Sequence, residues 1–177
     1  MKPGQDMIVT GYIGLEGTVL AVEKLEARLK KTLPQDLLDI ARSFREYLKA
    51  SPEAAVARQH GEIAMQEVRN GGIFAALWEL AEAHKIGMTV YLKKIPVRQE
   101  TIEICEVLEW NPYELLSGGC TILVTDNSND VIPELLDQGI PAAFIGKVTD
   151  SNDRVILNGE NVRYLNRPEP DEIEKLV

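Results

Sequence analysis

The strongest constraint in this sequence is a strand that ends at two consecutive glycines and is followed at once by a helix. Residues 65–72 predict a short buried strand that breaks at Gly71 and Gly72, and residues 73–83 predict an amphipathic helix. The first turn of a helix carries N–H groups without intrahelical partners, together with partial positive charge. The junction is therefore a candidate site for a phosphate or carboxylate. The alternative is a tight turn alone, because glycine reaches positive φ without steric cost.

Length and charge exclude several classes of protein. The 177 residues suit a single domain, and 28 acidic against 19 basic residues give a formal net charge of -9. This charge disfavours binding to nucleic acid or to an anionic membrane surface. The sequence contains no apolar run long enough to cross a bilayer and no signal peptide, so we expect a cytoplasmic protein. Cys105 and Cys120 lack CxxC spacing and lie in apolar stretches, which is typical of reduced thiols in a core.

The pattern along the chain mixes helices and strands without regular βαβ repetition. Periodicity predicts a helical hairpin over residues 15–50 and a hairpin turn at residues 149–153 between two late strands. We therefore predict one α+β domain over residues 1–177, a three-layer α/β/α arrangement with a mixed sheet and partial ferredoxin-like order. The helical hairpin should lie beside this core. The predicted strands are residues 7–10, 65–70, 88–92, 120–124, 142–148 and 154–157, and the predicted helices are 15–29, 34–48, 51–60, 73–83, 98–108, 128–138 and 172–177.

Several segments, in their order along the chain, resemble the carboxyl-terminal domain of the AIR synthase-related superfamily. That superfamily includes phosphoribosylaminoimidazole synthetase, selenophosphate synthetase, thiamine-monophosphate kinase and the hydrogenase-maturation dehydratase, and the sequence is most similar to the hydrogenase-maturation-like branch. The resemblance covers nearly the whole chain. It rests on residues 9–18 (VTGYIGLEGT), the glycine pair, residues 94–98 (KIPVR), residues 111–113 (NPY) before 117–119 (SGG), and residues 145–148 (IGKV).

The resemblance implies an ATP-dependent reaction in which a substrate oxygen or selenium atom receives a phosphoryl group. In this superfamily the nucleotide and metal sites lie mainly in an amino-terminal domain, and this chain begins where the carboxyl-terminal half begins. We therefore expect no cofactor on this chain itself, with ATP and Mg²⁺ bound by an amino-terminal ATP-binding domain of the same or another chain. We also expect a homo-oligomer such as a homodimer. Met1 is either a native start or the edge of a longer protein.

The sequence departs from the family where proton transfer would be expected. Many relatives have a His-Asp pair before the two glycines, whereas this chain has Gln66 and Glu67. Glutamine cannot exchange a proton near neutral pH, and a longer carboxylate is displaced by a methylene, so catalysis by this loop is doubtful. The hydrogenase-maturation branch often ends in a carbamoyl-accepting cysteine, but the chain ends in DEIEKLV. His60 and His84 have no triad partners nearby in the sequence, which favours structural or surface roles.

Two classes of function remain open. In the first, the domain is the substrate and phosphate side of an ATP-dependent enzyme and is inactive in isolation. Its predicted binding residues are Gly71, Gly72, Asn70, Arg69 and Ser117, with no catalytic residue and no metal ligand assigned. Arg69 would clamp a phosphate with two hydrogen bonds, or else form a solvent-facing ion pair. In the second, the domain is a non-catalytic interaction module or dimer scaffold.

Overall fold

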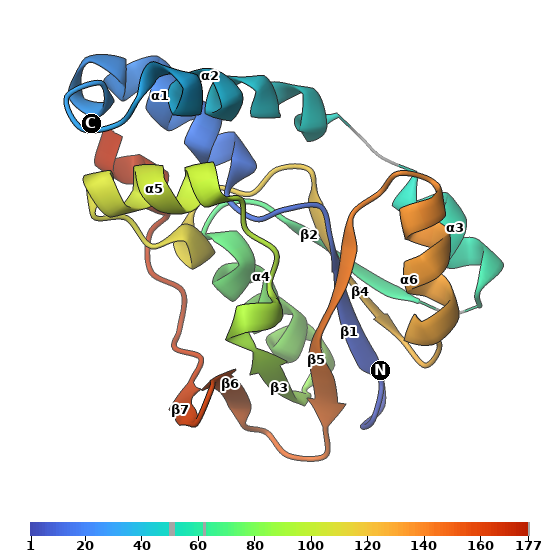
Figure 1. Ribbon diagram of the computed structural model, residues 1–177. Coiled ribbons are helices and arrows are strands. Elements are labelled where there is room, and N and C mark those ends of the chain that lie inside the picture. Colours follow the sequence, from blue (N-terminus) through green and yellow to red (C-terminus); the bar gives the residue numbers. More distant parts are fainter. Residues whose placement is uncertain (50–51, 62, 177) are drawn as a thin grey trace.

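A seven-stranded mixed sheet forms the centre of the fold (Figure 1). The computed structural model describes residues 1–49, 52–61 and 63–176. The strand order is β2-β4-β1-β5-β3-β6-β7, and all neighbours are antiparallel except β3 and β6, which run parallel. The strands are β1 (Asp6–Thr10), β2 (Ala64–Val68), β3 (Gly87–Tyr91), β4 (Cys120–Thr125), β5 (Ala142–Thr149), β6 (Arg154–Asn158) and β7 (Asn161–Tyr164).

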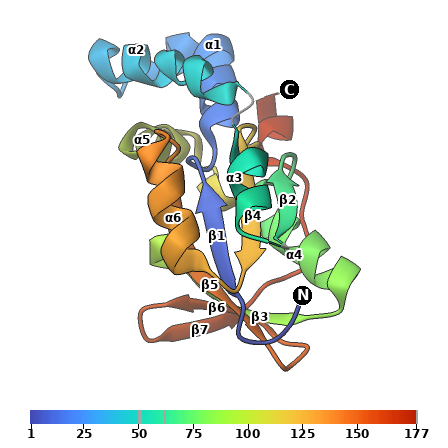
Figure 2. The same cartoon turned by 90° about the vertical axis from the view of Figure 1, so that its right-hand side faces the viewer.

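Helices cover both faces of the sheet. Helix α4 (Gly72–His84) packs on one face, whereas α3 (Glu53–Gln59) and α6 (Ser128–Asp137) pack on the other (Figure 2). Successive residues of a strand point to opposite faces. Accordingly, Met7 and Val9 of β1 belong to the cluster under α4, and Ile8 belongs to the cluster under α3 and α6. The predicted α+β class, mixed sheet and three layers are therefore confirmed.

A third group of helices lies beside the sheet, at the top of Figure 1. It contains α1 (Leu15–Leu29), α2 (Gln35–Ser43) and α5 (Gln99–Leu108), with the short 3-10 helices η1 (Phe44–Leu48) and η4 (Glu172–Leu176). These elements share a hydrophobic cluster whose fully buried members include Leu38, Phe44, Ile104 and Leu115. The helix pair therefore lies beside the core as predicted, and its partners are α5 and η4. Two further 3-10 turns are η2 (Leu92–Lys94) and η3 (Pro112–Glu114).

Two strand predictions were wrong in detail, and one strand was not predicted. Strand β2 is not buried: it pairs only with β4, and Met65 is 42% exposed. The turn at 149–153 does not join a hairpin, because β3 lies between β5 and β6 and pairs with both. The edge strand β7 was not predicted: its four residues alternate between polar and apolar, but the segment is short and none of them is buried. Insertion of β3 between two sequence neighbours is a long-range event that turn residues do not signal.

The helix predictions also needed corrections. Ile40 and Ile102 continue the apolar stripes of the helices predicted at 34–48 and 98–108, yet they are 45% and 37% exposed, while Thr101 and Ile104 fill the inner face of α5. Ser128 begins the helix predicted at 128–138, and its hydroxyl donates to the carboxylate of Asp6 and does not cap α6. The terminal helix predicted at 172–177 is a 3-10 helix, η4, which packs against the cluster of α1, α2 and α5. The predicted start of α3 at Ser51 and the last predicted helical residue, Val177, lie outside the described residues.

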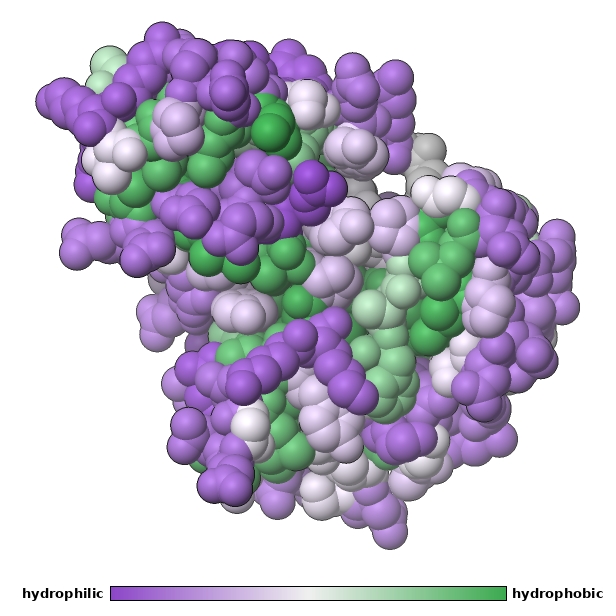
Figure 3. Space-filling model, in the orientation of Figure 1, coloured by the Kyte–Doolittle hydropathy of each residue, from purple (hydrophilic) through white to green (hydrophobic). Residues whose placement is uncertain are grey.

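The surface in the view of Figure 1 is mostly polar. Figure 3 shows apolar surface confined to seams between elements, while hydrophilic side chains cover most of the helices beside the sheet. Among the described residues, no helix combines the length and the apolar character needed to cross a membrane.

Candidate functional site

The two glycines at the start of α4 are buried, and their amides have partners within the chain. The Gly71 N–H donates to Oδ2 of Asp171 at 2.6 Å, and the Gly72 N–H donates to the carbonyl of Arg69 at 3.1 Å. Both glycines have positive φ, 81° and 65°, so they make the left-handed turn that favours glycine. In this structure Asp171 supplies the carboxylate at the helix start, so binding of an external anion to these amides stays a prediction and would require Asp171 to move away.

Ser117 is also a structural residue in this arrangement. Its side chain is fully buried, accepts a hydrogen bond from the Gly14 N–H at 2.7 Å and donates to the Leu115 carbonyl at 2.6 Å. These bonds join the loop before β4 to the start of α1. Because the Ser117 hydroxyl already donates its hydrogen to Leu115, it has none left to donate to a phosphate.

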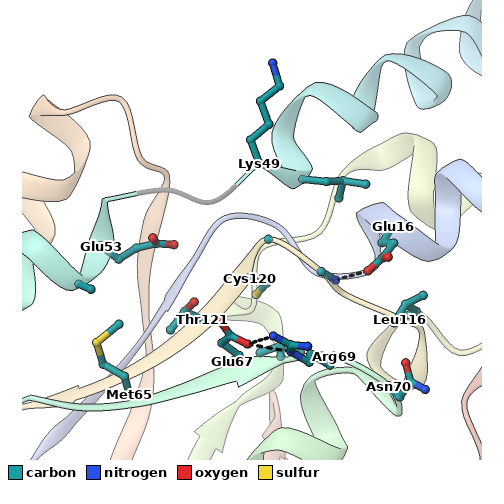
Figure 4. Close-up of a pocket in the computed structure, with 15 residues that line it drawn as sticks. Glu16, Lys49, Glu53, Met65, Glu67, Arg69, Asn70, Leu116, Cys120 and Thr121 are labelled. Atoms are coloured by element: carbon teal, nitrogen blue, oxygen red, sulfur yellow. Dashed lines mark hydrogen bonds and ion pairs between the residues drawn. The ribbon is translucent and has the colours of Figure 1, made fainter.

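Arg69 and Asn70, the other two predicted residues, lie at the mouth of an open pocket of about 650 Å³. Both are exposed, and they follow the carboxyl end of β2. The pocket is bounded by β2, the start of β4, the loop before β4 and the start of α3 (Figure 4). Its volume falls within the range of about 300–1,000 Å³ that is usual for small-molecule sites. We call it the β2–β4 pocket.

The floor of the β2–β4 pocket is set by strand register. Thr121 of β4 lies opposite Thr10 of β1 on one side and opposite Glu67 of β2 on the other. Directly paired residues of antiparallel strands point to the same face of the sheet, so these three polar side chains form one row. The sequence carries no local signal for this row, because its members are more than 50 residues apart.

Most charged groups of the β2–β4 pocket are already paired. The Glu67 carboxylate accepts a hydrogen bond from Arg69 Nε at 2.7 Å, and both side chains are largely exposed. Glu16 of α1 accepts the Gly118 N–H at 3.1 Å. Gln66 donates to the Glu67 carbonyl and to the Glu79 carboxylate, so it takes no part in proton transfer with Glu67. Among the described residues, no three His, Cys, Asp or Glu side chains are arranged to hold a metal ion.

Glu53, in the first turn of α3, is the buried carboxylate of the pocket and was missed by the sequence reasoning. It is only 7% exposed, and Oε1 accepts the Thr10 hydroxyl at 3.0 Å. Figure 4 shows its carboxylate extending from α3 toward Thr121. A glutamate after Pro52 indicates a helix start and nothing more, so only the tertiary structure brings Glu53 over the strand row.

Within the described part of the chain, the two cysteines and the two histidines have no neighbours that would make them catalytic. Burial raises the pKa of Cys105 to about 12, with a smaller contribution from Glu172, and burial also raises the pKa of Cys120. Both thiols are thus inert core groups, as the sequence indicated. His60 contacts the carboxylate of Glu134 and joins α3 to α6, while His84 is exposed in the last turn of α4.

Known proteins resemble the chain in sequence and in fold. It is 25% identical over 161 residues to the putative hydrogenase expression/formation protein of Methanocaldococcus jannaschii, covering 89% of this chain and 46% of that protein. It is 28% identical over 156 residues to phosphoribosylformylglycinamidine synthase subunit PurL of Corynebacterium glutamicum, covering 86% of this chain and 20% of that subunit.

Among solved structures, HypE of E. coli, a hydrogenase maturation protein, superposes with a TM-score of 0.79 at 19% identity. The match covers all of this chain and 54% of HypE. The chain thus spans about half the length, or less, of these relatives. Residues 2–158 match the family described as AIR synthase related protein, C-terminal domain. The chain therefore belongs to the AIR synthase-related family and corresponds to its C-terminal domain.

Proposed function

We propose that this chain is the substrate side of an ATP-dependent enzyme and acts together with an amino-terminal ATP-binding domain of the same or another chain. The match to roughly half of HypE supports this division of labour. One solved HypE structure is described as a complex with ATP and another as a HypE–HypF complex, which supports a nucleotide and a protein partner for the assembled enzyme. ATP and Mg²⁺ then belong to the partner domain, and this chain contributes the substrate side.

The observation that carries the proposal is the β2–β4 pocket. It combines a concave space of about 650 Å³ with a cation, Arg69, and an amide side chain, Asn70, at its mouth. Arg69 uses Nε and one terminal nitrogen on Glu67, which leaves its other N–H donors for an anionic substrate group. Gly71, Gly72 and Ser117 support this mouth by fixing the turn and the neighbouring loop.

Catalysis by the isolated chain is not part of the proposal. Glu67 is bound to Arg69 and Gln66 is not titratable, so the end of β2 lacks an acid–base pair. The role of the pocket is then to bind and orient a substrate. Positioning of this kind contributes to phosphoryl transfer, which depends chiefly on alignment and charge stabilisation.

A phosphate titration tests the proposal. Wild-type protein should bind inorganic phosphate with shifts in the NMR amide signals of Asn70 and Thr121, and Arg69→Ala should weaken this binding on the order of tenfold. Arg58→Ala removes an exposed arginine of α3 that does not line the pocket, so it serves as the control. Equal phosphate binding by wild type and Arg69→Ala would contradict the proposed site.

The second candidate is an interaction module or dimer scaffold, and the edge strands favour it. Strand β7 exposes Val162 and Tyr164, each 61% accessible, and β2 pairs with the sheet on one side only. Exposed edge strands are templates for pairing with another chain. Sedimentation equilibrium of wild type and Val162→Lys distinguishes this function: a dimer lost on the substitution supports it, and a monomer in both proteins opposes it.

A further inference from the structure

The β2–β4 pocket contains one buried carboxylate whose hydrogen-bonding capacity is only half used. Oε1 of Glu53 accepts the Thr10 hydroxyl, whereas Oε2 has no hydrogen-bond or ion-pair partner among the residues that the structure describes. This oxygen is also not among the fully enclosed unpaired atoms of those residues. Glu53 lines the pocket, and Figure 4 shows its carboxylate extending from α3 into the space over β4.

The other carboxylates of the pocket differ from Glu53 in this respect. Glu67 is paired with Arg69, and Glu16 with the amide of Gly118. A carboxylate withdrawn from water is costly unless it is paired or fully hydrogen-bonded. The first turn of α3 favours a negative charge, and the Thr10 hydroxyl offsets part of the cost. Oε2 has no protein donor among the described residues, so it can accept hydrogen bonds from water or from a group bound in the pocket.

We propose that Glu53 is a specificity-determining residue that binds a cationic nitrogen group of the substrate, while the anionic group of the substrate lies at Arg69. A cationic N–H donor suits this oxygen best, because it supplies a hydrogen bond and neutralises the buried charge together. Thr121 lies on the strand row between the two ends of this arrangement. This inference rests on the proposed function, because it assigns the inner end of the same pocket. The substrate class is a small zwitterion with an amine or guanidine at one end and a phosphate or carboxylate at the other.

The test compares two probes that differ only in the cationic group. Phosphoethanolamine carries a phosphate and an ammonium, and ethyl phosphate has the phosphate without the ammonium. In NMR titrations that follow the amide signals of Thr10, Asn70 and Thr121, wild-type protein should bind phosphoethanolamine more tightly, on the order of tenfold. Glu53→Gln should abolish this preference and leave the affinity for ethyl phosphate unchanged.

Two further variants keep the test decisive. Glu174→Gln changes an exposed glutamate outside the pocket and should retain the preference. Glu53→Asp keeps the charge but withdraws the carboxylate, so it should lower the preference even if Glu53→Gln does not fold. The role of Glu53 would be overturned if wild type bound the two probes equally, or if the folded Glu53 variants still preferred phosphoethanolamine. The phosphate site would stand in either case. If neither probe shifts the pocket signals, both the role of Glu53 and the proposed phosphate site are wrong.

Discussion

Gly72 shows how one residue combines a backbone requirement with close packing. Its φ is 65°, and a Cβ added there would lie 2.4 Å from the Tyr113 carbonyl oxygen and 2.8 Å from the Leu115 nitrogen. Both neighbours are backbone atoms, so neither can move aside cheaply. The position therefore excludes every side chain for two separate reasons, and its main role is to let η3 approach the start of α4.

We predict that Gly72→Ala lowers the free energy of unfolding by more than about 2 kcal/mol, because the left-handed conformation alone costs about 1 kcal/mol and the clash adds to it. Urea denaturation measures the loss. Gly139→Ala is the matched control: its φ is 75°, but nothing lies within 4 Å of the added Cβ. Equal losses for the two variants would show that the contact with η3 is unimportant.

The reactivity of the two cysteine thiols reports how well each side chain is buried. The pKa of Cys105 is raised to about 12, chiefly by burial, so its thiolate is scarce at pH 8. We predict that a thiol reagent such as DTNB reacts with neither cysteine in the native protein at pH 8, and with both after unfolding in guanidinium. Rapid reaction of one thiol in the native protein would show that the cluster around it opens readily.

At the scale of elements, Asp171 joins three segments that are distant in sequence. Its Oδ2 accepts the Gly71 amide, while Oδ1 accepts the amides of Leu116 at 3.1 Å and Ile173 at 2.9 Å. One buried carboxylate thus ties the C-terminal segment to the start of α4 and to the loop before β4. Hydrogen bonds to a charged group are worth more than neutral ones, and their loss leaves buried donors without partners.

We predict that Asp171→Ala lowers the free energy of unfolding by about 3 kcal/mol, because three amides lose their acceptor. Glu174→Ala, an exposed change in the 3-10 helix η4 that follows Asp171, should stay within about 0.5 kcal/mol of wild type. Chemical denaturation of both variants provides the comparison. A small loss for Asp171→Ala would mean that water readily replaces the carboxylate.

Asp6 links β1 to β5 and to the start of α6. Burial opposes ionisation of Asp6, but the hydrogen bonds from Lys147 and Ser128 and the charge of Lys147 outweigh it, so the pKa of Asp6 lies below 3.8. A carboxyl group with a lowered folded pKa stabilises the protein above its unfolded pKa of about 3.9, and this contribution is lost as the pH falls through the folded value.

We therefore predict that Asp6→Asn is less stable than wild type by about 1 kcal/mol above pH 5, and that the gap narrows below about pH 4. Thermal or urea unfolding across this pH range measures it. Asp150→Asn, at an exposed position, should show no such gap. A gap that is independent of pH would assign the effect to packing instead of charge.

At the scale of the whole molecule, the division of labour in the proposed function is itself testable. We predict that the chain alone neither hydrolyses Mg-ATP nor binds it tightly, because orientation and neutralisation of the triphosphate dominate phosphoryl transfer and are assigned to the other domain. Calorimetric titration combined with a phosphate-release assay checks both parts. Tight binding with turnover by the chain would contradict the proposal.

Local patterns in the sequence predicted much of the fold. Alternating and helical periodicities placed six of the seven strands and all six α-helices near their observed positions, because these patterns reflect which face of an element avoids water. The order of short motifs identified the family. Side-chain exposure was less predictable: Ile40 and Ile102 fit an apolar stripe, yet their surroundings leave them exposed.

The sequence by itself determined most of the elements and the glycine turn before α4, because these depend on neighbours within a few residues, and the mixture of elements indicated the class of fold. Only the tertiary structure decided that Asp171 accepts the Gly71 amide and that β3 separates β5 from β6. It also decided that Glu53 lies over the row of side chains that contains Thr121. Each of these facts joins segments that are distant along the chain. Their pairing depends on how the strands are ordered and in which register they meet, and a one-residue shift of register would turn every side chain of a strand to the opposite face.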